Sequence, residues 1–397
     1  MRLLVLSTQP WAFPARLCMA LRRVGFHVEG AAPDYGYLGR SAAPAAWHRL
    51  RPWHLQQDLA RAIKKARPDR LVPCDDLATG LMVQLHANPA MRNIVEASLG
   101  DPAAYSVALS KGAQMALATE IGVPIPQTLH DLNRLTFDAA IAQGSARRVL
   151  KVDGNFGGQG VAVLSDVASA GAVWDQLTAR PSVFEAAKCA VLERSVRALV
   201  AWRSWQPAAP HLQEFVDGPV ANRAVLCERG QVLAGISVVA VQTTSERGPT
   251  SVVRVIEDAG MTKAAEVFVA RLGLSGFHGF DFVLAPDGRA LMLEMNPRAT
   301  PICHLASGGH GLAAALLRAM GQDAPPVMLP TPGQIVALFP NELARNSSST
   351  HLQGWHDMPY DDLPLLRRVL DDLATTIRLT ELRMFLRKRL YRSRAGL

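Results

Sequence analysis

The sequence offers few residues for covalent cross-links or soft-metal sites. Its five cysteines show no C-x-x-C spacing, and its eleven histidines form no H-E-x-x-H pair. Disulfide frameworks and zinc sites need such closely spaced ligands. We therefore expect a reducing compartment and free, mostly buried thiols. The cysteines are Cys18, Cys74, Cys189, Cys227 and Cys303.

Long apolar runs are also missing. No stretch reaches the roughly 20 apolar residues that a membrane-spanning helix needs, and the chain opens directly into a strand rather than into a basic-then-apolar leader. We expect a soluble cytoplasmic protein with no membrane span.

Aromatic residues make up only 6% of the chain and do not interleave with basic residues. The formal net charge of +8 therefore gives little support for nucleic-acid binding, and we expect none. Much of the positive charge lies near the end of Leu363–Leu397, a segment that we predict to be helical. We expect this helix to pack on the protein or fray in solvent rather than lie on an anionic membrane.

The first part of the chain alternates strands and helices. Strands are predicted at Arg2–Ser7, His27–Ala32 and Arg70–Cys74, with helices at Pro14–Val24 and Leu55–Ala66. This order predicts a parallel, doubly wound α/β domain over residues 1–104, whose ligands bind at the carboxyl ends of the strands.

Two aspartates, Asp75 and Asp76, stand at one of those carboxyl ends. At least one of them is expected to cap the following helix. Contact with a substrate amine or hydroxyl is the alternative for the other.

A hairpin with converging oxygen ligands is predicted between residues 279 and 296. Its two strands are separated by a turn containing Pro286 and Asp-Gly, which brings Asp281 beside Glu294, and strand alternation puts Asn296 on the same face. Two carboxylates and an amide oxygen suit Mg²⁺, and the guanidinium of Arg298 suits a phosphate or carboxylate there. An ordinary polar surface hairpin is the alternative.

A glycine-rich loop lies far upstream of this hairpin. A strand ending near Lys151 precedes Asp153–Gly160, and a second strand, Val161–Leu164, follows. Glycines let backbone N–H groups approach phosphate oxygens closely. The loop is neither a Walker A motif nor a dinucleotide fingerprint, because no Gly-Lys-Ser/Thr closes it and a strand follows it.

Together, the lysine-led glycine loop and the downstream D…E-x-N-P-R pattern resemble the ATP-grasp superfamily, over roughly residues 106–320. The resemblance implies an ATP-grasp domain of two α+β subdomains over residues 105–322, behind the Rossmann-like domain, with a small extension at 323–397. ATP and Mg²⁺, with Mn²⁺ as an alternative ion, are the implied cofactors.

The resemblance also implies roles for individual residues. Lys151 would contact the adenine and α-phosphate, and Lys111, within one helix expected at Tyr105–Ile121, would reach the phosphates. The loop glycines over the β- and γ-phosphates would be Gly157, Gly158 and Gly160. The metal ligands would be Asp281, Glu294 and Asn296.

The adenine hinge, the ribose ligand and the role of Arg254 follow less closely from the pattern. Glu214 and Val216 would form the hinge against the adenine edge, while the ribose partner stays open between Asn222 and Asp217, because no glutamate stands where relatives have one. Arg254 is either a ligand for a substrate carboxylate or phosphoryl group, or a strand-face arginine in solvent.

By resemblance, this is a carboxylate–amine ligase, with Arg298 and Arg254 as the expected catalytic groups and small carboxylates and amines as substrates. A small-molecule kinase using the same site and a catalytically silent ATP-binding protein are the alternatives. A homodimer is compatible with the resemblance, since dimers are frequent among relatives.

Overall fold

In a computed structural model of the chain, four parallel strands form the N-terminal sheet, in the order β3-β2-β1-β4. The structure describes residues 1–143, 147–152, 160–180, 182–192, 202–203, 210–245, 248–305, 311–325 and 330–376. The N-terminal elements are β1 (Arg2–Leu6), α1 (Phe13–Arg23), β2 (His27–Ala32), η1 (Leu38–Arg40), β3 (Trp47–Arg49), α2 (Leu55–Ala66), β4 (Arg70–Pro73), α3 (Asp76–Leu85) and α4 (Pro89–Leu99).

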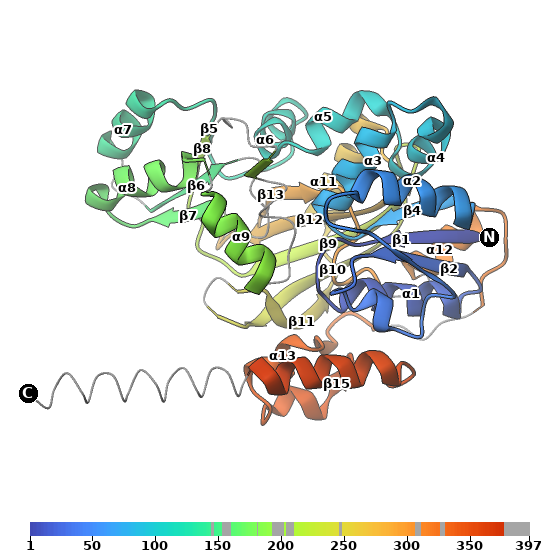
Figure 1. The fold of residues 1–397 in the computed structure, drawn as a ribbon. Coiled ribbons are helices and arrows are strands. Elements are labelled where there is room, and N and C mark those ends of the chain that lie inside the picture. Colours follow the sequence, from blue (N-terminus) through green and yellow to red (C-terminus); the bar gives the residue numbers. More distant parts are fainter. Residues whose placement is uncertain are drawn as a thin grey trace, which may run out of the picture.

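Both faces of this sheet are covered, as the predicted doubly wound domain requires. Leu3 and Val5 of β1 pack with α1, whereas Leu4 and Leu6 pack with α2, α3 and α4. Successive side chains of a strand point to opposite faces, so an unbroken apolar run is buried on both. The fold class predicted for this domain is confirmed (Figure 1).

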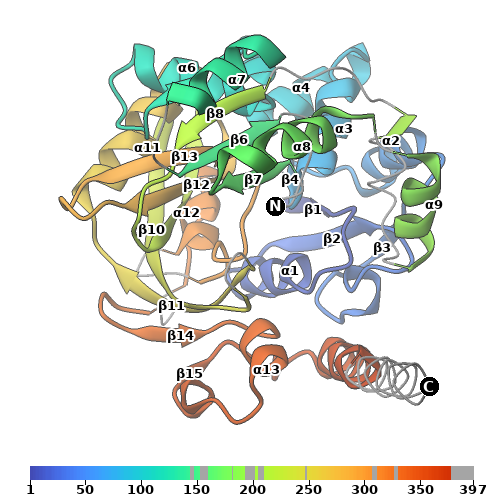
Figure 2. The same ribbon diagram turned by 90° about the vertical axis from the view of Figure 1, so that its left-hand side faces the viewer.

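A seven-stranded sheet in the order β13-β12-β9-β10-β11-β14-β15 forms the centre of the molecule. Its strands are β9 (Val220–Glu228), β10 (Gln231–Thr243), β11 (Thr250–Ile256), β12 (Gly276–Leu284), β13 (Ala290–Asn296), β14 (Ile335–Ala337) and β15 (Trp355–His356). One face packs on α6 (Lys111–Glu120) and α11 (Ala259–Leu272), and the other packs on α1 and α12 (Leu312–Ala319). This second face therefore joins the sheet to the N-terminal domain (Figure 2).

A smaller antiparallel sheet, β5-β8-β6-β7, lies at the far end of the molecule from the C-terminal extension (Figure 1). Its elements are β5 (Thr128–Leu129), α7 (Arg134–Gln143), β6 (Arg148–Val152), β7 (Val161–Leu164), α8 (Val167–Thr178), α9 (Val183–Leu192) and β8 (Pro210–Glu214). Phe137 and Trp174, whose ring centroids are 4.6 Å apart, join α7 to α8 in a separate small core. The strands that flank the glycine loop are thus confirmed.

The single helix predicted at Tyr105–Ile121 is wrong. After η2 (Pro102–Ala104), the chain forms α5 (Tyr105–Ala108) and then α6 (Lys111–Glu120). Ser110 breaks the helix because its hydroxyl caps α6, accepting from the N–H of Ala113 at 3.2 Å. Lys111 therefore begins a new helix.

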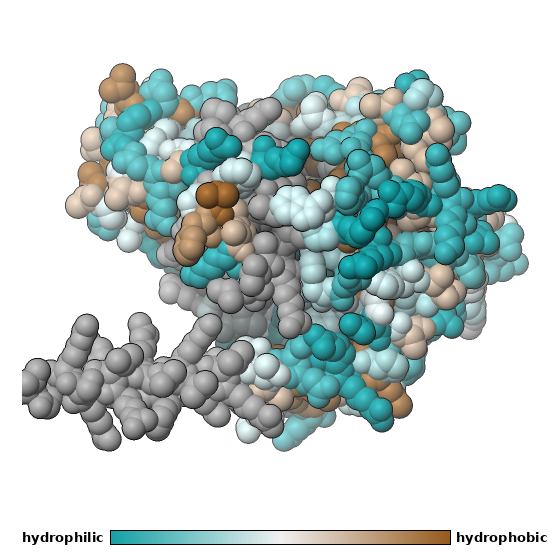
Figure 3. All heavy atoms as spheres, viewed as in Figure 1, coloured by the Kyte–Doolittle hydropathy of each residue, from teal (hydrophilic) through white to brown (hydrophobic). Residues whose placement is uncertain are grey.

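The C-terminal extension adds β14 and β15 to the seven-stranded sheet. Between these strands lie α13 (Asn341–Arg345) and η3 (Thr350–Gln353), and residues 363–376 are helical. The remainder of the predicted basic helix lies outside the described residues. Hydrophilic side chains predominate on the visible surface of the N-terminal domain and the extension (Figure 3). Within the described ranges, none of the helices has the length and apolar character needed to cross a bilayer.

Candidate functional site

The hairpin of β12 and β13 pairs two carboxylates side by side, as the sequence predicted. Asp281 is the register partner of Glu294, and Gly279 is the partner of Asn296. Asn296 lies on the same face, where its Nδ2 donates to Asp281 Oδ2 at 2.9 Å. Gly288 closes the turn at φ 84°, a backbone conformation that glycine adopts without strain.

Asn222 joins this cluster from β9. It is the register partner of Asp281 on the other side of β12, and its Nδ2 donates to Asp281 Oδ1 at 2.5 Å. The sequence had offered Asn222 as a ribose ligand, within a stretch not predicted to be a strand. Because 220–228 is a central strand, Asn222 instead lies beside the predicted metal ligand.

Two lysines reach β13 from different parts of the fold. Lys111 Nζ, at the start of α6, lies 2.5 Å from Glu294 Oε2. Lys151, on β6 and only 6% exposed, donates from Nζ to the carbonyl of Leu293 at 3.2 Å. The small sheet and α6 thus place positive charge at one hairpin strand, although 183 residues separate Lys111 from Glu294 in the sequence.

The lysines differ in their electrostatics. Burial and the neighbouring charge of Lys111 lower the pKa of Lys151 to about 8, although Glu294 opposes the change. Burial alone would also lower the pKa of Lys111, but the Glu294 carboxylate reverses the effect and the pKa is raised. Lys111 is therefore firmly cationic, whereas Lys151 needs a further negative charge to hold its proton fully.

The two carboxylates also differ. Burial, followed by the charge of Glu294, raises the pKa of Asp281 to about 6. Burial acts on Glu294 in the same direction, but the charges of Lys111 and Lys151 outweigh it, and the pKa of Glu294 is lowered. Asp281 is thus the member of the cluster whose negative charge is least compensated by the protein.

Arg298 connects the hairpin to the N-terminal domain. Its Nε donates to Asp76 Oδ1 at 2.9 Å, its Nη2 donates to Asn296 Oδ1 at 2.9 Å, and its guanidinium lies 5.7 Å from the ring centroid of Trp11. The neighbouring Asp75 caps α3, accepting from the Ala78 N–H at 2.9 Å. The predicted cap is confirmed, and the other aspartate faces Arg298.

Arg254 is not part of this cluster. Its register partner on β10 is Val239, which pairs with Ala221 and, through it, with Phe282. Registered partners share a face of the sheet, and Phe282 neighbours Asp281 in sequence, so Arg254 lies on the opposite face from the carboxylates. It is exposed there. The expectation of a catalytic Arg254 beside the other site residues is corrected accordingly.

The remaining predicted positions lie around the small sheet. Gly157 and Gly158 lie outside the described residues, whereas the Gly160 carbonyl accepts from the Val152 N–H at 2.9 Å and so closes the base of the loop. Glu214 is exposed at the end of β8, and Val216 packs beside the β12–β13 hairpin.

Sequence reasoning missed His211. It is the register partner of Lys151 across β6 and β8, is 1% exposed, and stacks on His130 with ring centroids 6.3 Å apart. Neither ring nitrogen has a hydrogen-bond partner among the described residues, and burial followed by the charge of Lys151 lowers its pKa to about 3. A lone histidine at a strand position carries no motif, so only the pairing with Lys151 identifies it.

The donor set at the hairpin fits a hard divalent cation. It consists of the oxygens of Asp281, Glu294 and Asn296, without sulfur or imidazole, which favours Mg²⁺ or Mn²⁺ over zinc. The raised pKa of Asp281 means that an added positive charge would be stabilised there. Across the part of the chain that the structure describes, no group of three or more His, Cys, Asp or Glu side chains could hold a metal ion, and the hairpin itself contributes two carboxylates and an amide.

Solved structures share the overall fold of this chain. The chain has the ATP-grasp fold. No protein-family model matches the sequence, and no curated protein matches it significantly.

Three of the similar solved structures illustrate the likeness. The ADP complex of the N5-carboxyaminoimidazole ribonucleotide synthetase purK has a TM-score of 0.57 and 13% identity, covering 83% of this chain and 79% of that chain. The biotin carboxylase domain dimer of the Hydrogenobacter thermophilus 2-oxoglutarate carboxylase has a TM-score of 0.56 and 12% identity, covering 81% and 70%. The L-amino acid ligase from Bacillus licheniformis has a TM-score of 0.51 and 15% identity, covering 81% and 74%.

Proposed function

We propose that this protein is an ATP- and Mg²⁺-dependent ligase that activates a small carboxylate as an acyl phosphate and joins it to an amine. The observation that carries the proposal is the convergence of the paired carboxylates Asp281 and Glu294 with Lys111 and Lys151. The fold supports it, because solved structures of similar fold include an L-amino acid ligase and a carboxyaminoimidazole ribonucleotide synthase complexed with ATP.

Under this proposal the nucleotide lies between the small sheet and the hairpin. Lys151, beside His211, would contact the adenine end and α-phosphate, and the backbone of Glu214 and Val216 would meet the adenine edge. Gly160, with Gly157 and Gly158, would approach the β- and γ-phosphates. A phosphate near Lys151 would also supply the negative charge that its lowered pKa calls for.

Three residues would hold the metal ion at the phosphates: Asp281, Glu294 and Asn296. A bound Mg²⁺ supplies charge neutralisation at the transferred phosphoryl group. Asn222 would keep Asp281 in place through its 2.5 Å hydrogen bond rather than bind the ribose, which leaves Asp217 as the ribose candidate. Lys111 would exchange its Glu294 partner for a phosphate oxygen.

The proposed reaction has two steps. An oxygen of the substrate carboxylate attacks the γ-phosphorus, and ADP leaves as the bond from the γ-phosphorus to the bridging oxygen breaks. The amine then attacks the acyl carbon, phosphate leaves, and the amine loses a proton as the amide forms. Arg298, held by Asp76 and Asn296, would stabilise the negative charge that develops on the acyl oxygen.

ADP and phosphate release, measured against pooled small carboxylates and amines, tests this function. We expect phosphate release to require Mg²⁺, a carboxylate and an amine, and to be lost in Glu294→Gln. Glu120→Gln is the matched control, because Glu120 forms an exposed ion pair with Arg271 on the surface.

Other outcomes of that assay would overturn the ligase. A stable phosphorylated product formed without an amine would identify a kinase. ATP binding without turnover in every pool would identify a catalytically silent protein.

A further inference from the structure

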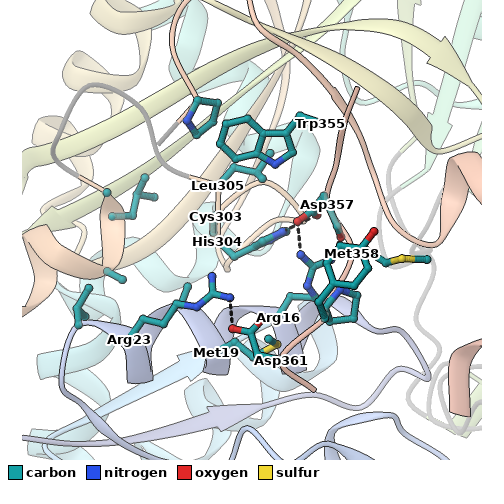
Figure 4. A pocket seen from close by; sticks show the side chains of 18 of the residues that line it. Arg16, Met19, Arg23, Cys303, His304, Leu305, Trp355, Asp357, Met358 and Asp361 are labelled. Carbon is teal, nitrogen blue, oxygen red and sulfur yellow. Dashed lines mark hydrogen bonds and ion pairs between the residues drawn. The ribbon is translucent and has the colours of Figure 1, made fainter. Parts of the chain in front are cut away.

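A cavity lies where the C-terminal extension meets the N-terminal domain. It has a volume of about 300 Å³ and is lined by α1, by residues 303–305, by the start of α12 and by residues 355–361 (Figure 4). That volume is at the lower end of the range for small-molecule sites.

Its lining contains none of the hairpin cluster. Trp11 and Phe13 stand between Arg298 and His304, with successive ring contacts of 6.0 and 6.1 Å. The cavity is therefore distinct from the proposed nucleotide and metal site.

One wall of the cavity is a buried ionic cluster. The Asp357 carboxylate accepts from Arg16 and lies 2.7 Å from His304 Nε2, and the three side chains are only 7–8% exposed (Figure 4). Arg16 and His304 each engage one oxygen of Asp357, so this carboxylate is already neutralised, while the buried Nδ1 of His304 has no hydrogen-bond partner among the described residues.

The rim carries a second ion pair of a different kind. Arg23, in the last turn of α1, pairs with Asp361 of the extension, and their side chains are 55% and 60% exposed. Exposed pairs of this kind contribute little to stability, so each partner can exchange for a ligand group at little cost. Tyr360, 65% exposed, stands beside them.

Between wall and rim, several apolar side chains line the cavity. They include the thioethers of Met19 and Met358, the Leu305 side chain and the indole of Trp355. Thioethers adapt readily to ligands of different shape. The apolar part of a small ligand would therefore be desolvated here, while its charged groups stay at the solvent-exposed rim.

We propose that this cavity binds a small zwitterion, such as an α-amino acid with an apolar side chain, whose carboxylate pairs with Arg23 and whose ammonium pairs with Asp361. One cation and one anion at the mouth of an apolar cavity match the two charges and the side chain of such a molecule. Because Arg23 belongs to the N-terminal domain and Asp361 to the extension, the bound zwitterion also fastens the extension in place.

Binding without nucleotide tests this inference independently of the proposed ligase. An apolar amino acid such as leucine would be titrated by calorimetry and in thermal unfolding, beside its decarboxylated amine and its deaminated acid. We expect the amino acid to bind and to raise the melting temperature, and both single-charge analogues to bind roughly tenfold more weakly or worse, because each loses one charged pair.

Variants at the rim sharpen the test. Arg23→Ala and Asp361→Ala are expected to fold, because both side chains are exposed, and each is expected to weaken binding by roughly tenfold or more. Arg49→Ala, which removes another exposed ion pair outside the cavity, should bind as the wild type does. Equal binding of the amine or acid analogue, unchanged binding in both rim variants, or no binding of any apolar amino acid at millimolar concentration would overturn the inference.

Discussion

Two buried clusters of charged side chains in this protein differ in how far their carboxylates are neutralised. At the extension, one carboxylate, Asp357, lies between Arg16 and His304, and these charges lower its pKa even though burial opposes the change. At the hairpin, Asp281 lies beside a second carboxylate, and its pKa is raised to about 6. Asp357 is thus neutralised by the protein itself, whereas the charge of Asp281 is only partly compensated.

Under the proposed function, the extension cluster is structural and the hairpin cluster binds ligands. A paired buried carboxylate holds elements together, and removing one partner leaves a charge unpaired. A pair of carboxylates with a raised pKa costs stability in the free protein and gains it when a ligand binds. The two clusters should therefore respond in opposite directions to the same substitution.

The largest expected effect is at the extension. Asp357→Asn should destabilise the protein by about 3–5 kcal/mol, because the buried Arg16 loses its charged partner. Urea unfolding measures the change. Asp34→Asn, at the exposed pair with Arg49, is the control and should change stability by less than about 1 kcal/mol. Equal effects of the two substitutions would contradict the assignment of Asp357 as a structural group.

The second-largest effect is expected on the rate of ATP turnover. Glu294→Gln should lower ATP turnover about 100-fold or more, because a charge that faces the transferred phosphoryl group is removed. Steady-state ADP release measures this change, with Glu120→Gln as the unaffected comparison. Turnover within a few-fold of wild type in Glu294→Gln would show that the hairpin does not perform the chemistry.

A smaller change in stability, opposite in sign to that of Asp357→Asn, is expected for Asp281→Asn. In chelator-treated protein at pH 8, Asp281→Asn should stabilise the fold by about 1–2 kcal/mol, since it removes an ionised carboxylate beside Glu294. Asn222 and Asn296 donate to different oxygens of Asp281, so only one of the two amides keeps its acceptor in the asparagine side chain, and this loss limits the gain. Urea unfolding of both proteins would reveal a loss of stability instead if the carboxylate were structural.

The smallest effect is the pH dependence that distinguishes the two clusters. The raised folded-state pKa of Asp281 favours the fold at low pH, so this contribution falls as the pH rises from about 4 to about 6. The lowered pKa of Asp357 acts in the opposite sense: its contribution is present above about pH 4 and is lost as the pH falls through its folded-state value. Unfolding free energies of wild type and of each Asn variant, measured from about pH 2 to pH 7, would show slopes of the same sign if the two environments were alike.

The sequence predicted the elements whose signals are local. The β12–β13 hairpin follows from a turn flanked by alternating strands, and the side-by-side placement of Asp281 and Glu294 follows from its register. The cap by Asp75 follows from its place before a helix. These features needed no knowledge of distant residues.

The contacts that the sequence did not reveal are those that tertiary pairing decides. Asn222 and Arg223 interrupt an apolar stretch, and the pairing of that segment with β10 and β12 places it as a central strand. The face occupied by Arg254 depends on a register carried across three strand pairs, and the contact of Lys111 with Glu294 joins two distant elements. His211 acquires a role only through the strand opposite it.

The most direct test of the central claim is Mn²⁺ binding, followed by electron paramagnetic resonance in the presence of ADP. Mn²⁺ accepts the same oxygen ligands as Mg²⁺ and can be observed directly. Wild type should bind the ion in a nucleotide-dependent manner, and Asp281→Asn and Glu294→Gln should each weaken that binding by at least tenfold, whereas Asp34→Asn should not. Equal Mn²⁺ binding in wild type and in both hairpin variants would contradict the assignment of the hairpin as the metal and nucleotide site.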